Sequence, residues 1–457
     1  MERKSRKIWV RFFTLLCLLT LSVSCSSSED GEESTDNAGA DTSAPTVTAI
    51  SPEDGSADVS VSSTISVTFS KSIEPGYATT SSNEVCSGTM QISTDSFNTC
   101  IPGVLTYDTS RRTYTLTAGS SSVTRELASL TKHQLKVTTG IKDYFGNVLA
   151  EDYTSSGFTT ASVCSSGCSW TDAGSSGLSA GIGHTLVFHQ GKLWVMGGGN
   201  GSSVYSKVFY SSDGASWTDA SAAENWSGRN HHAATSFDGK LWVTGGGSNG
   251  SNLLNDVLSS SDGKTWKQVT STAAWTPRHK HSLLVFKNKL YLLGGIDNST
   301  SYMNDIWSSS DGETWTQVTD NSSWSKRYGH AAAVFNNKIW IMGGDNGSLL
   351  SDVWYSSDDN ASSWTQASTS GSIWSARSGH TAMVFDGKLW VIGGNGGSGT
   401  LNSWSSTDGS EWSDAGAIEN ETSRSGMGGA VLSNRLYISG GYIGNNTYKD
   451  DVKKYGP

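Results

Sequence analysis

Charge, proline and heptad repeats are all scarce in this chain of 457 residues. Charged residues make up 16% of the sequence and only six residues are proline. The lack of heptads excludes a coiled coil. Glycine and tryptophan are instead abundant, with 52 and 18 residues. Together with many Ser and Thr residues they favour short strands joined by tight turns, so the composition predicts an all-β protein.

Basic charge is also lacking outside the N-terminus. The net charge is −10, and because residues 1–24 hold five basic residues and one acidic residue, the remainder carries −14. An acidic surface repels phosphate backbones, so we expect no nucleic-acid partner. The chain is longer than one ordinary domain, which predicts two or three folding units.

The first 24 residues have the pattern of an export signal. Basic residues up to Arg11 precede the apolar run Phe12–Leu21, which is too short to span a bilayer as a helix. The following Leu21-Ser22-Val23-Ser24-Cys25 resembles the lipobox of bacterial lipoproteins, which implies removal of residues 1–24 as a signal peptide and acylation of Cys25. Leucine stands four residues before this cysteine, where the lipobox has it three before, and ordinary secretion is the alternative.

Residues 25–43 form an acidic, serine-rich segment without large apolar residues. Such a segment buries too little surface to fold, so we interpret it as a flexible tether that leads from the membrane at Cys25. Acidic residues after a lipidated cysteine resemble surface-export signals in some bacteria and inner-membrane retention signals in others. We expect the outer membrane or cell surface, with the inner membrane as the alternative.

Four further cysteines follow the predicted anchor: Cys86, Cys100, Cys164 and Cys168. An even number in an exported protein favours disulfides. Three pairings are possible, and Cys86–Cys100 with Cys164–Cys168 needs the least rearrangement of the chain. A zinc site is disfavoured, because neither pair has C-x2-C spacing and no histidine accompanies them. We expect neither a metal nor another cofactor.

Residues 44–160 predict a domain of short, half-buried strands. Apolar and polar residues alternate in Thr64–Phe69, Thr113–Thr117 and Leu135–Thr138, with turn residues between the strands. The domain resembles the bacterial Ig-like domain of the SbsA type, which implies a β-sandwich that acts as a spacer. The resemblance rests on Ser51–Gly55, Val67–Ser70, Asp143–Asn147 and Gly157–Thr160.

Two sequence motifs recur with the same period in residues 164–457. A Gly-Gly pair follows an apolar strand six times, at 197–198, 245–246, 294–295, 343–344, 393–394 and 440–441. A tryptophan after a polar turn recurs at Trp170, Trp217, Trp266, Trp315, Trp364 and Trp412. Each unit also holds four strand signals. This pattern resembles the kelch repeat, which implies a six-bladed β-propeller.

The two ends of this region predict how the propeller closes. Trp170 precedes the first Gly-Gly pair, and the last unit ends without a tryptophan strand of its own. We therefore expect the Trp170 strand to become the fourth strand of the sixth blade, which removes open sheet edges. The predicted fold is all-β: an Ig-like β-sandwich followed by a six-bladed kelch-type β-propeller closed by an N-terminal strand.

A histidine recurs at one position of five units, and Met427 takes its place in the sixth. The five are His184, His232, His281, His330 and His380. A repeated position meets the same neighbours in every unit. We therefore interpret these residues as packing groups with a local hydrogen bond and not as metal ligands.

Arginine and tryptophan recur in the loops that join one unit to the next. Three residues before the repeated histidine or methionine stand Arg229, Arg278, Arg327, Arg377 and Arg424. Three residues before the arginine stand Trp226, Trp275, Trp324 and Trp374. Such loops face a ligand-binding surface in kelch propellers, which implies exposed tryptophans and ligand contact. For arginine, bracing of adjacent blades is favoured over ligand contact.

The two positions between this arginine and histidine stop repeating in three units. They are Ile182-Gly183, Ser378-Gly379 and Ser425-Gly426 in three units, but Asn230-His231, His279-Lys280 and Tyr328-Gly329 in the second to fourth. Aromatic and hydrogen-bonding groups suit a glycan or a protein loop. The predicted ligand-binding residues are Trp226, Arg229, His231, Trp275, Arg278, His279, Lys280, Trp324, Arg327, Tyr328, Trp374 and Arg377.

These features favour a recognition or adhesion lipoprotein over an enzyme. The varied positions carry aromatic and basic groups without paired carboxylates, so no catalytic residue is predicted. No cysteine follows Cys168, which excludes the Tyr–Cys copper site of galactose oxidase. A carbohydrate-active enzyme, such as a sugar mutarotase-like kelch protein, is the alternative. The expected partners are a membrane, through Cys25, and an extracellular or periplasmic glycan or protein.

Overall fold

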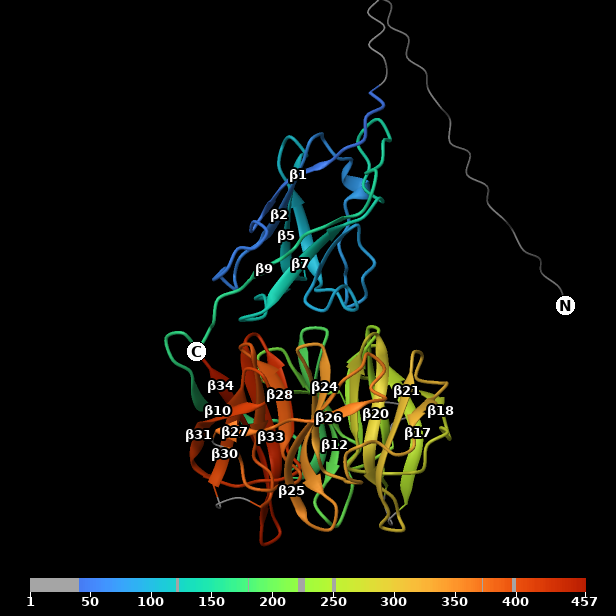
Figure 1. The fold of residues 1–457 in the computed structure, drawn as a ribbon, viewed down its shortest axis with the longest axis vertical. Helices are drawn as coiled ribbons and strands as arrows, with labels where there is room; N and C mark the ends of the chain where they lie inside the picture. Colours follow the sequence, from blue (N-terminus) through green and yellow to red (C-terminus); the bar gives the residue numbers. More distant parts are fainter. Residues whose placement is uncertain are drawn as a thin grey trace, which may run out of the picture. The chain divides into compact units, whose positions relative to one another are not determined.

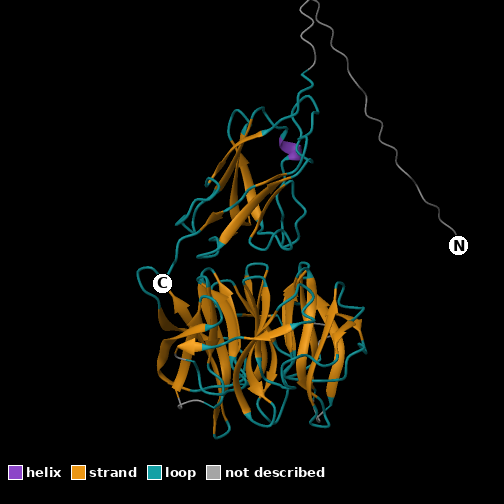
Figure 2. Cartoon of the chain, in the orientation of Figure 1, coloured by secondary structure: helices purple, strands orange, loops and turns teal. Residues whose placement is uncertain are grey.

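A computed structural model describes residues 41–120, 123–179, 181–220, 227–248, 252–371, 373–396 and 400–457. These residues form strands, turns and loops with one short 3-10 turn, η1 (Pro75–Tyr77), so the predicted all-β class is confirmed (Figure 1, Figure 2). The predicted signal segment 1–24, Cys25 and Trp226 lie outside the described residues. No helix in the part of the chain described here is long and apolar enough to cross a membrane.

The Ig-like region folds into two sheets around one core, as predicted. One sheet has the order β1-β2-β5-β4 with β6 beside β5, and the other has β3-β7-β8 with β9 beside β7. Their bounds are β1 (Val47–Ser51), β2 (Ile65–Phe69), β3 (Met90–Ser93), β4 (Gly103–Tyr107), β5 (Thr113–Ser120), β6 (Val123–Thr124), β7 (Lys132–Val137), β8 (Tyr153–Thr154) and β9 (Phe158–Thr159). Alternate apolar residues of both sheets point inward, so that Val67 and Phe69 share a core with Leu135 and Val137.

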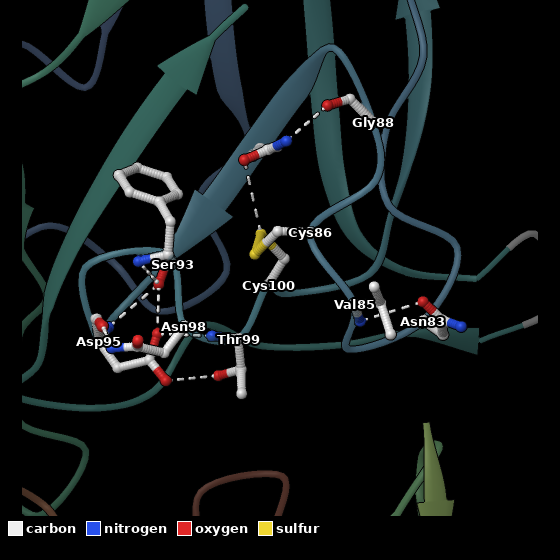
Figure 3. Close-up of a disulfide and its surroundings, with 11 residues drawn as sticks. Asn83, Val85, Cys86, Gly88, Ser93, Asp95, Asn98, Thr99 and Cys100 are labelled. Atoms are coloured by element: carbon white, nitrogen blue, oxygen red, sulfur yellow. Dashed lines mark hydrogen bonds between the residues drawn. A yellow bond between two sulfur atoms is a disulfide. The ribbon is translucent and has the colours of Figure 1, made fainter. Parts of the chain in front are cut away.

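Both predicted disulfides, Cys86–Cys100 and Cys164–Cys168, are present. Figure 3 shows Cys86–Cys100 near a tight turn that follows β3. In this turn Asp95 accepts hydrogen bonds from the hydroxyls of Ser93 and Thr99, each at 2.7 Å. The cross-link and the turn together give the irregular segment before β4 a defined path.

The repeat region forms six sheets among the residues described. The inner strand of each sheet contacts the inner strand of the next, and β32 of the last sheet contacts β11 of the first. Strands β11 to β14 are Ile182–His189, Lys192–Gly199, Val208–Ser211 and Thr218–Asp219; β15 to β18 are Ala233–Phe237, Lys240–Gly247, Leu253–Ser260 and Lys267–Thr270; β19 to β22 are Ser282–Phe286, Lys289–Ile296, Tyr302–Ser309 and Thr316–Thr319. Strands β23 to β26 are Ala331–Phe335, Lys338–Asp345, Leu349–Ser356 and Trp364–Gln366; β28 to β31 are Thr381–Phe385, Lys388–Ile392, Thr400–Ser406 and Glu411–Thr422, with β27 (Ser370–Gly371) at their edge.

The last sheet combines strands from both ends of the repeat region. It contains β32 (Gly428–Leu432), β33 (Arg435–Gly444), β34 (Thr447–Gly456) and β10 (Ser169–Ser175). β10 pairs antiparallel with β34 and places Trp170 opposite Tyr455. This is the strand pairing that the sequence predicted for the Trp170 segment.

Neighbouring sheets pack so closely that glycine is required between them. Gly263 has a φ of +67°, and a Cβ atom at this position would lie 2.0 Å from the ring of Trp194 in the preceding sheet. Trp266, one of the periodic tryptophans, is buried in the same cluster as Trp194. The first glycine of a Gly-Gly pair serves a similar purpose, because a Cβ on Gly245 would lie 2.8 Å from the carbonyl oxygen of Arg278, which leads into the next sheet.

Candidate functional site

One backbone position of each repeat builds a ring between the six inner strands. These residues stand directly before the repeated histidine or methionine and are Gly183, His231, Lys280, Gly329, Gly379 and Gly426. Each N–H donates to the carbonyl oxygen of its counterpart in the preceding repeat at 2.7 to 2.9 Å, and Gly183 donates to Gly426. Within the described residues these six hydrogen bonds form a complete circle.

The backbone at this position is left-handed in every repeat. All six φ values lie between +50° and +72°. Glycine adopts this conformation freely, whereas His231, at +50°, and Lys280, at +52°, are strained there. The left-handed conformation costs a residue with a Cβ atom roughly 1–2 kcal/mol, and such strain is concentrated at functional sites. The side chains of His231 and Lys280, the two residues at this position that are not glycine, are therefore candidates for a functional role.

The ring borders a cavity of about 220 Å³, called the axial cavity below. Its lining includes His231 and Lys280 together with the ring glycines Gly183, Gly329, Gly379 and Gly426. The wall is completed by polar groups from Tyr328, Ser378, Asn395 and Ser425. The structure thus brings together His231, Lys280 and Tyr328, three of the residues that vary between repeats.

A second cavity, of about 510 Å³, adjoins the first. Both cavities are lined by His231 and Lys280, and the second also by Asn230, His279 and Asp297. A ligand of several units could therefore occupy both cavities and contact the same histidine and lysine.

Lys280 lies over the ring of Tyr328. Its Nζ atom is 5.0 Å from the ring centroid, within the range of a cation–π interaction. Tyr328 in turn donates a hydrogen bond to Asp345 at 3.1 Å. Burial lowers the pKa of Lys280, and the charge of Asp345 opposes this shift. Among the described residues no ion pair joins Lys280 to a carboxylate, and Asp345 is the acidic group whose charge acts on it.

The phenol and imidazoles near Lys280 are neutral at physiological pH. Burial and the bond to Asp345 raise the pKa of Tyr328 to about 12. Burial and the charge of Lys280 lower the pKa of His279 to about 4 and that of His231 well below its usual value. The rings of His231 and His279 meet edge to face, with 5.9 Å between centroids. Neutral imidazole both donates and accepts hydrogen bonds, which suits a hydroxyl-rich ligand.

The prediction of exposed ligand-binding tryptophans was wrong for Trp275, Trp324 and Trp374. All three are buried, with at most 2% of their surface exposed. They pack edge to face against the periodic tryptophans, for example Trp374 against Trp412 with 4.5 Å between centroids. Their large apolar surfaces fill the joints between sheets instead of facing a ligand.

Bracing of adjacent blades, the role favoured for the repeated arginines, is the role of Arg229, Arg278, Arg327 and Arg377, and the ligand contacts predicted as their second role are not supported by their burial. These side chains are at most 3% exposed. Arg278 donates to both carboxylate oxygens of Asp305, at 2.6 and 2.8 Å, and to the carbonyl of Gly294. Its own carbonyl accepts a bond from Gly246 of the preceding sheet, so each arginine ties two sheets together.

Arg377 departs from this pattern because Asn402 stands where the other four repeats with this arginine have aspartate. Its guanidinium bonds to Gly393 and Ser375 and lies 4.2 Å from the ring centroid of Trp404. Burial lowers its pKa to about 10.

All five repeated histidines are buried packing groups, as predicted, and four of them form the predicted local hydrogen bond, whereas neither ring nitrogen of His330 has a hydrogen-bond partner within the described part of the chain. His184 bonds to Ser439, His232 to Thr185, His281 to Thr244 and His380 to Met342, at 2.9 to 3.1 Å, each across to the preceding sheet. The described residues contain no group of three or more His, Cys, Asp or Glu that could hold a metal ion.

Asp345 and Asn395 belong to the site although sequence reasoning missed them. Each directly follows a Gly-Gly pair, a position that also stops repeating. Asp345 forms a β-bridge with Tyr328, and Asn395 forms one with Ser378. A comparison of the residues after each Gly-Gly pair could have found them.

Two family models match the sequence. The KLHDC2/KLHL20/DRC7 Kelch-repeats domain matches residues 183–394 and 310–456. A bacterial Ig-like domain matches residues 41–160. A search of curated proteins found no match.

Proposed function

Because the chain belongs to the Kelch-repeat family and carries a bacterial Ig-like domain, we propose that it is an envelope-anchored recognition protein that binds a glycan at the axial cavity. Both domains are consistent with a binding or adhesion role. The observation that carries the proposal is the presence of His231 and Lys280 at left-handed positions where the other four repeats have glycine. Their side chains line both cavities, so the strain places two polar groups where a ligand would contact them.

The chemistry of the axial cavity favours a sugar over a protein loop. Its volume is below the roughly 300–1,000 Å³ of pockets that enclose a drug-sized ligand, so one small unit fits. Hydroxyl, amide and neutral imidazole groups line it, and these pair with sugar hydroxyls. Lys280 adds a cation without an ion-paired carboxylate among the described residues, which favours an acidic sugar.

The proposed location is the outer membrane or cell surface. Cys25 would hold the chain on the membrane through its acyl groups, and the Ig-like domain would act as the spacer. The acidic charge of the chain disfavours nucleic acid as a competing partner. Radiolabelled palmitate incorporated by the parent, but not by a Cys25→Ala variant, tests this anchorage.

A glycan array with acidic and neutral oligosaccharides tests the ligand. We expect binding by the parent and its loss in Lys280→Gly, because the cation is removed while the backbone conformation is relieved of strain. Lys287→Gly is the matched control, since Lys287 also has a positive φ, +47°, but lines neither cavity. Binding that Lys280→Gly retains in full would contradict the proposal, and binding only to peptides would assign a protein ligand.

A carbohydrate-active enzyme is the second candidate. The observation in its favour is the Lys280–Tyr328–Asp345 cluster at the cavity, which could exchange protons with a sugar. The pKa of about 12 for Tyr328 makes it a weak acid and argues for binding alone. Turnover of a sialic acid or hexose by the purified chain, abolished in Tyr328→Phe, would establish the enzyme.

A further inference from the structure

The Ig-like domain carries an exposed apolar patch that its fold does not use. The patch consists of Tyr77, Tyr144, Phe145 and Val148, whose exposed fractions are 38%, 46%, 68% and 44%. The β-bridge between Lys142 and Val148 connects its parts, and the Nζ atom of Lys142 lies 4.4 Å from the centroid of the Tyr77 ring. Large apolar groups gathered on a soluble surface mark an interaction site more often than scattered ones do.

The turn that presents Tyr144 and Phe145 is held firmly. Asp143 is buried, and its Oδ1 atom accepts hydrogen bonds from the N–H groups of Phe145 and Asn147, both at 2.9 Å. A rigid turn loses little conformational entropy on binding, so the exposed rings are suited to contact a partner.

This turn lies where the described chain enters the domain. The Nζ atom of Lys71 donates to Ser43 Oγ at 2.6 Å and lies 3.7 Å from the carboxylate of Asp143. Figure 2 shows η1, which contains Tyr77, at the same end of the domain as the first described residues. The apolar patch therefore adjoins the point where the segment from Cys25 joins the domain.

The length of that segment limits how far the patch can be from the membrane. Seventeen residues, 25–41, precede Thr42. A chain of 17 residues reaches no farther than about 60 Å even when fully extended. With Cys25 acylated, the patch would be kept at a high effective concentration near the bilayer surface.

Cationic groups border the patch and match the charge of anionic lipids. Arg111 lies over the Tyr144 ring at 5.3 Å and Lys142 over the Tyr77 ring. Tyrosine is favoured at the interface of a bilayer, where its ring is apolar and its hydroxyl is hydrated. Basic residues add attraction to anionic headgroups.

We propose that this patch docks on the surface of the membrane to which the chain is tethered, with Phe145 inserted among the lipids. The inference rests on the membrane anchorage in the proposed function but not on the ligand of the axial cavity. Docking would fix the orientation of the Ig-like domain relative to the bilayer, which attachment through Cys25 at one point does not do by itself.

Vesicle co-sedimentation of residues 26–457, which lack the acylation site, tests the docking. With vesicles of phosphatidylethanolamine and phosphatidylglycerol, we expect the parent to bind and the Tyr144→Ser/Phe145→Ser variant to bind about tenfold more weakly. Ile373→Ser is the matched control, because Ile373 is an exposed apolar residue of the repeat region. Absence of parent binding, or equal binding by the double variant, would overturn the proposal.

A fluorescent probe provides a second measurement that does not depend on loss of a side chain. An environment-sensitive label on Phe145→Cys should shift its emission to the blue when vesicles are added, and the same label on Ile373→Cys should not. An unshifted emission at position 145 contradicts insertion. Self-association without vesicles that the double variant abolishes would assign the patch to a second copy and also overturn the proposal.

Failure of the patch to dock on a membrane can be distinguished from failure of the anchorage at Cys25. The test protein carries no acyl group, so a negative palmitate label on Cys25 in cells would contradict the anchorage without altering the vesicle result. Vesicle binding that fails while Cys25 is labelled would contradict docking alone.

Discussion

At the scale of the residue, His231 and Lys280 occupy a left-handed backbone position at which the other four repeats have glycine. Replacement by glycine should relieve the left-handed strain, and the greater freedom of glycine in the unfolded chain offsets part of this gain. We expect His231→Gly and Lys280→Gly each to raise the free energy of unfolding by up to about 1 kcal/mol. Urea denaturation measures the change. A clear loss of stability would mean that these side chains hold the fold, not a ligand.

The braced arginines provide a second prediction at this scale. Arg278 is buried against Asp305, and removal of one partner leaves a buried charge unpaired. We expect Arg278→Met to lower the free energy of unfolding by about 3–5 kcal/mol. Arg377→Met should cost less, because no carboxylate is left without its partner among the described residues. Equal losses in the two variants, measured by urea denaturation, would contradict the importance of the ion pair.

At the scale of the element, the joints between sheets depend on paired tryptophans. Trp275 is 1% exposed and meets Trp315 edge to face at 6.2 Å. We expect Trp275→Ala to lower the free energy of unfolding by about 3–5 kcal/mol through the cavity that it leaves. Ligand affinity of the folded variant should be unchanged, because Trp275 lines neither cavity. Loss of ligand affinity in a Trp275→Ala variant of normal stability would instead support the ligand contact that the sequence predicted for Trp275.

At the scale of the whole molecule, the buried histidines that recur in five of the six repeats make the free energy of unfolding depend on pH. Burial lowers the pKa of His184 to about 4 and those of His330 and His380 to about 3. The unfolded chain binds these protons near pH 6.5, so it gains protons that the folded chain does not. Stability is therefore complete above about pH 6.5 and falls as the pH is lowered, by about 1.4 kcal/mol per pH unit for each such histidine.

Urea denaturation between about pH 7 and about pH 5 tests this dependence. His380→Met copies the sixth repeat, which has Met427 at this position, and should reduce the slope by about 1.4 kcal/mol per pH unit. A slope that is the same in the parent and in His380→Met would show that this histidine is protonated in the folded state.

The period of the repeats and the spacing of the cysteines were enough to predict the architecture and most of the local structural features. The Gly-Gly and tryptophan marks predicted the repeats, the position of Trp170 predicted its pairing with the last strand, and the cysteine spacing predicted both disulfides. These features are local or recur at a fixed interval, so one repeat reports on the others. The non-repeating residues also directed attention to His231, Lys280 and Tyr328, which the fold brings to one cavity.

The sequence could not decide which repeated polar and aromatic residues face solvent. Arginine and tryptophan in a loop have the same spacing whether they contact a ligand or fill a joint between sheets. Only the packed structure shows that Asp305, 27 residues after Arg278, neutralises it, and that Trp275 meets Trp315. The sequence by itself determined the repeat, its number and its exceptions, because these depend on local periodicity. Burial, the left-handed ring and the cavity depend on how six sheets meet, which the tertiary structure alone decides.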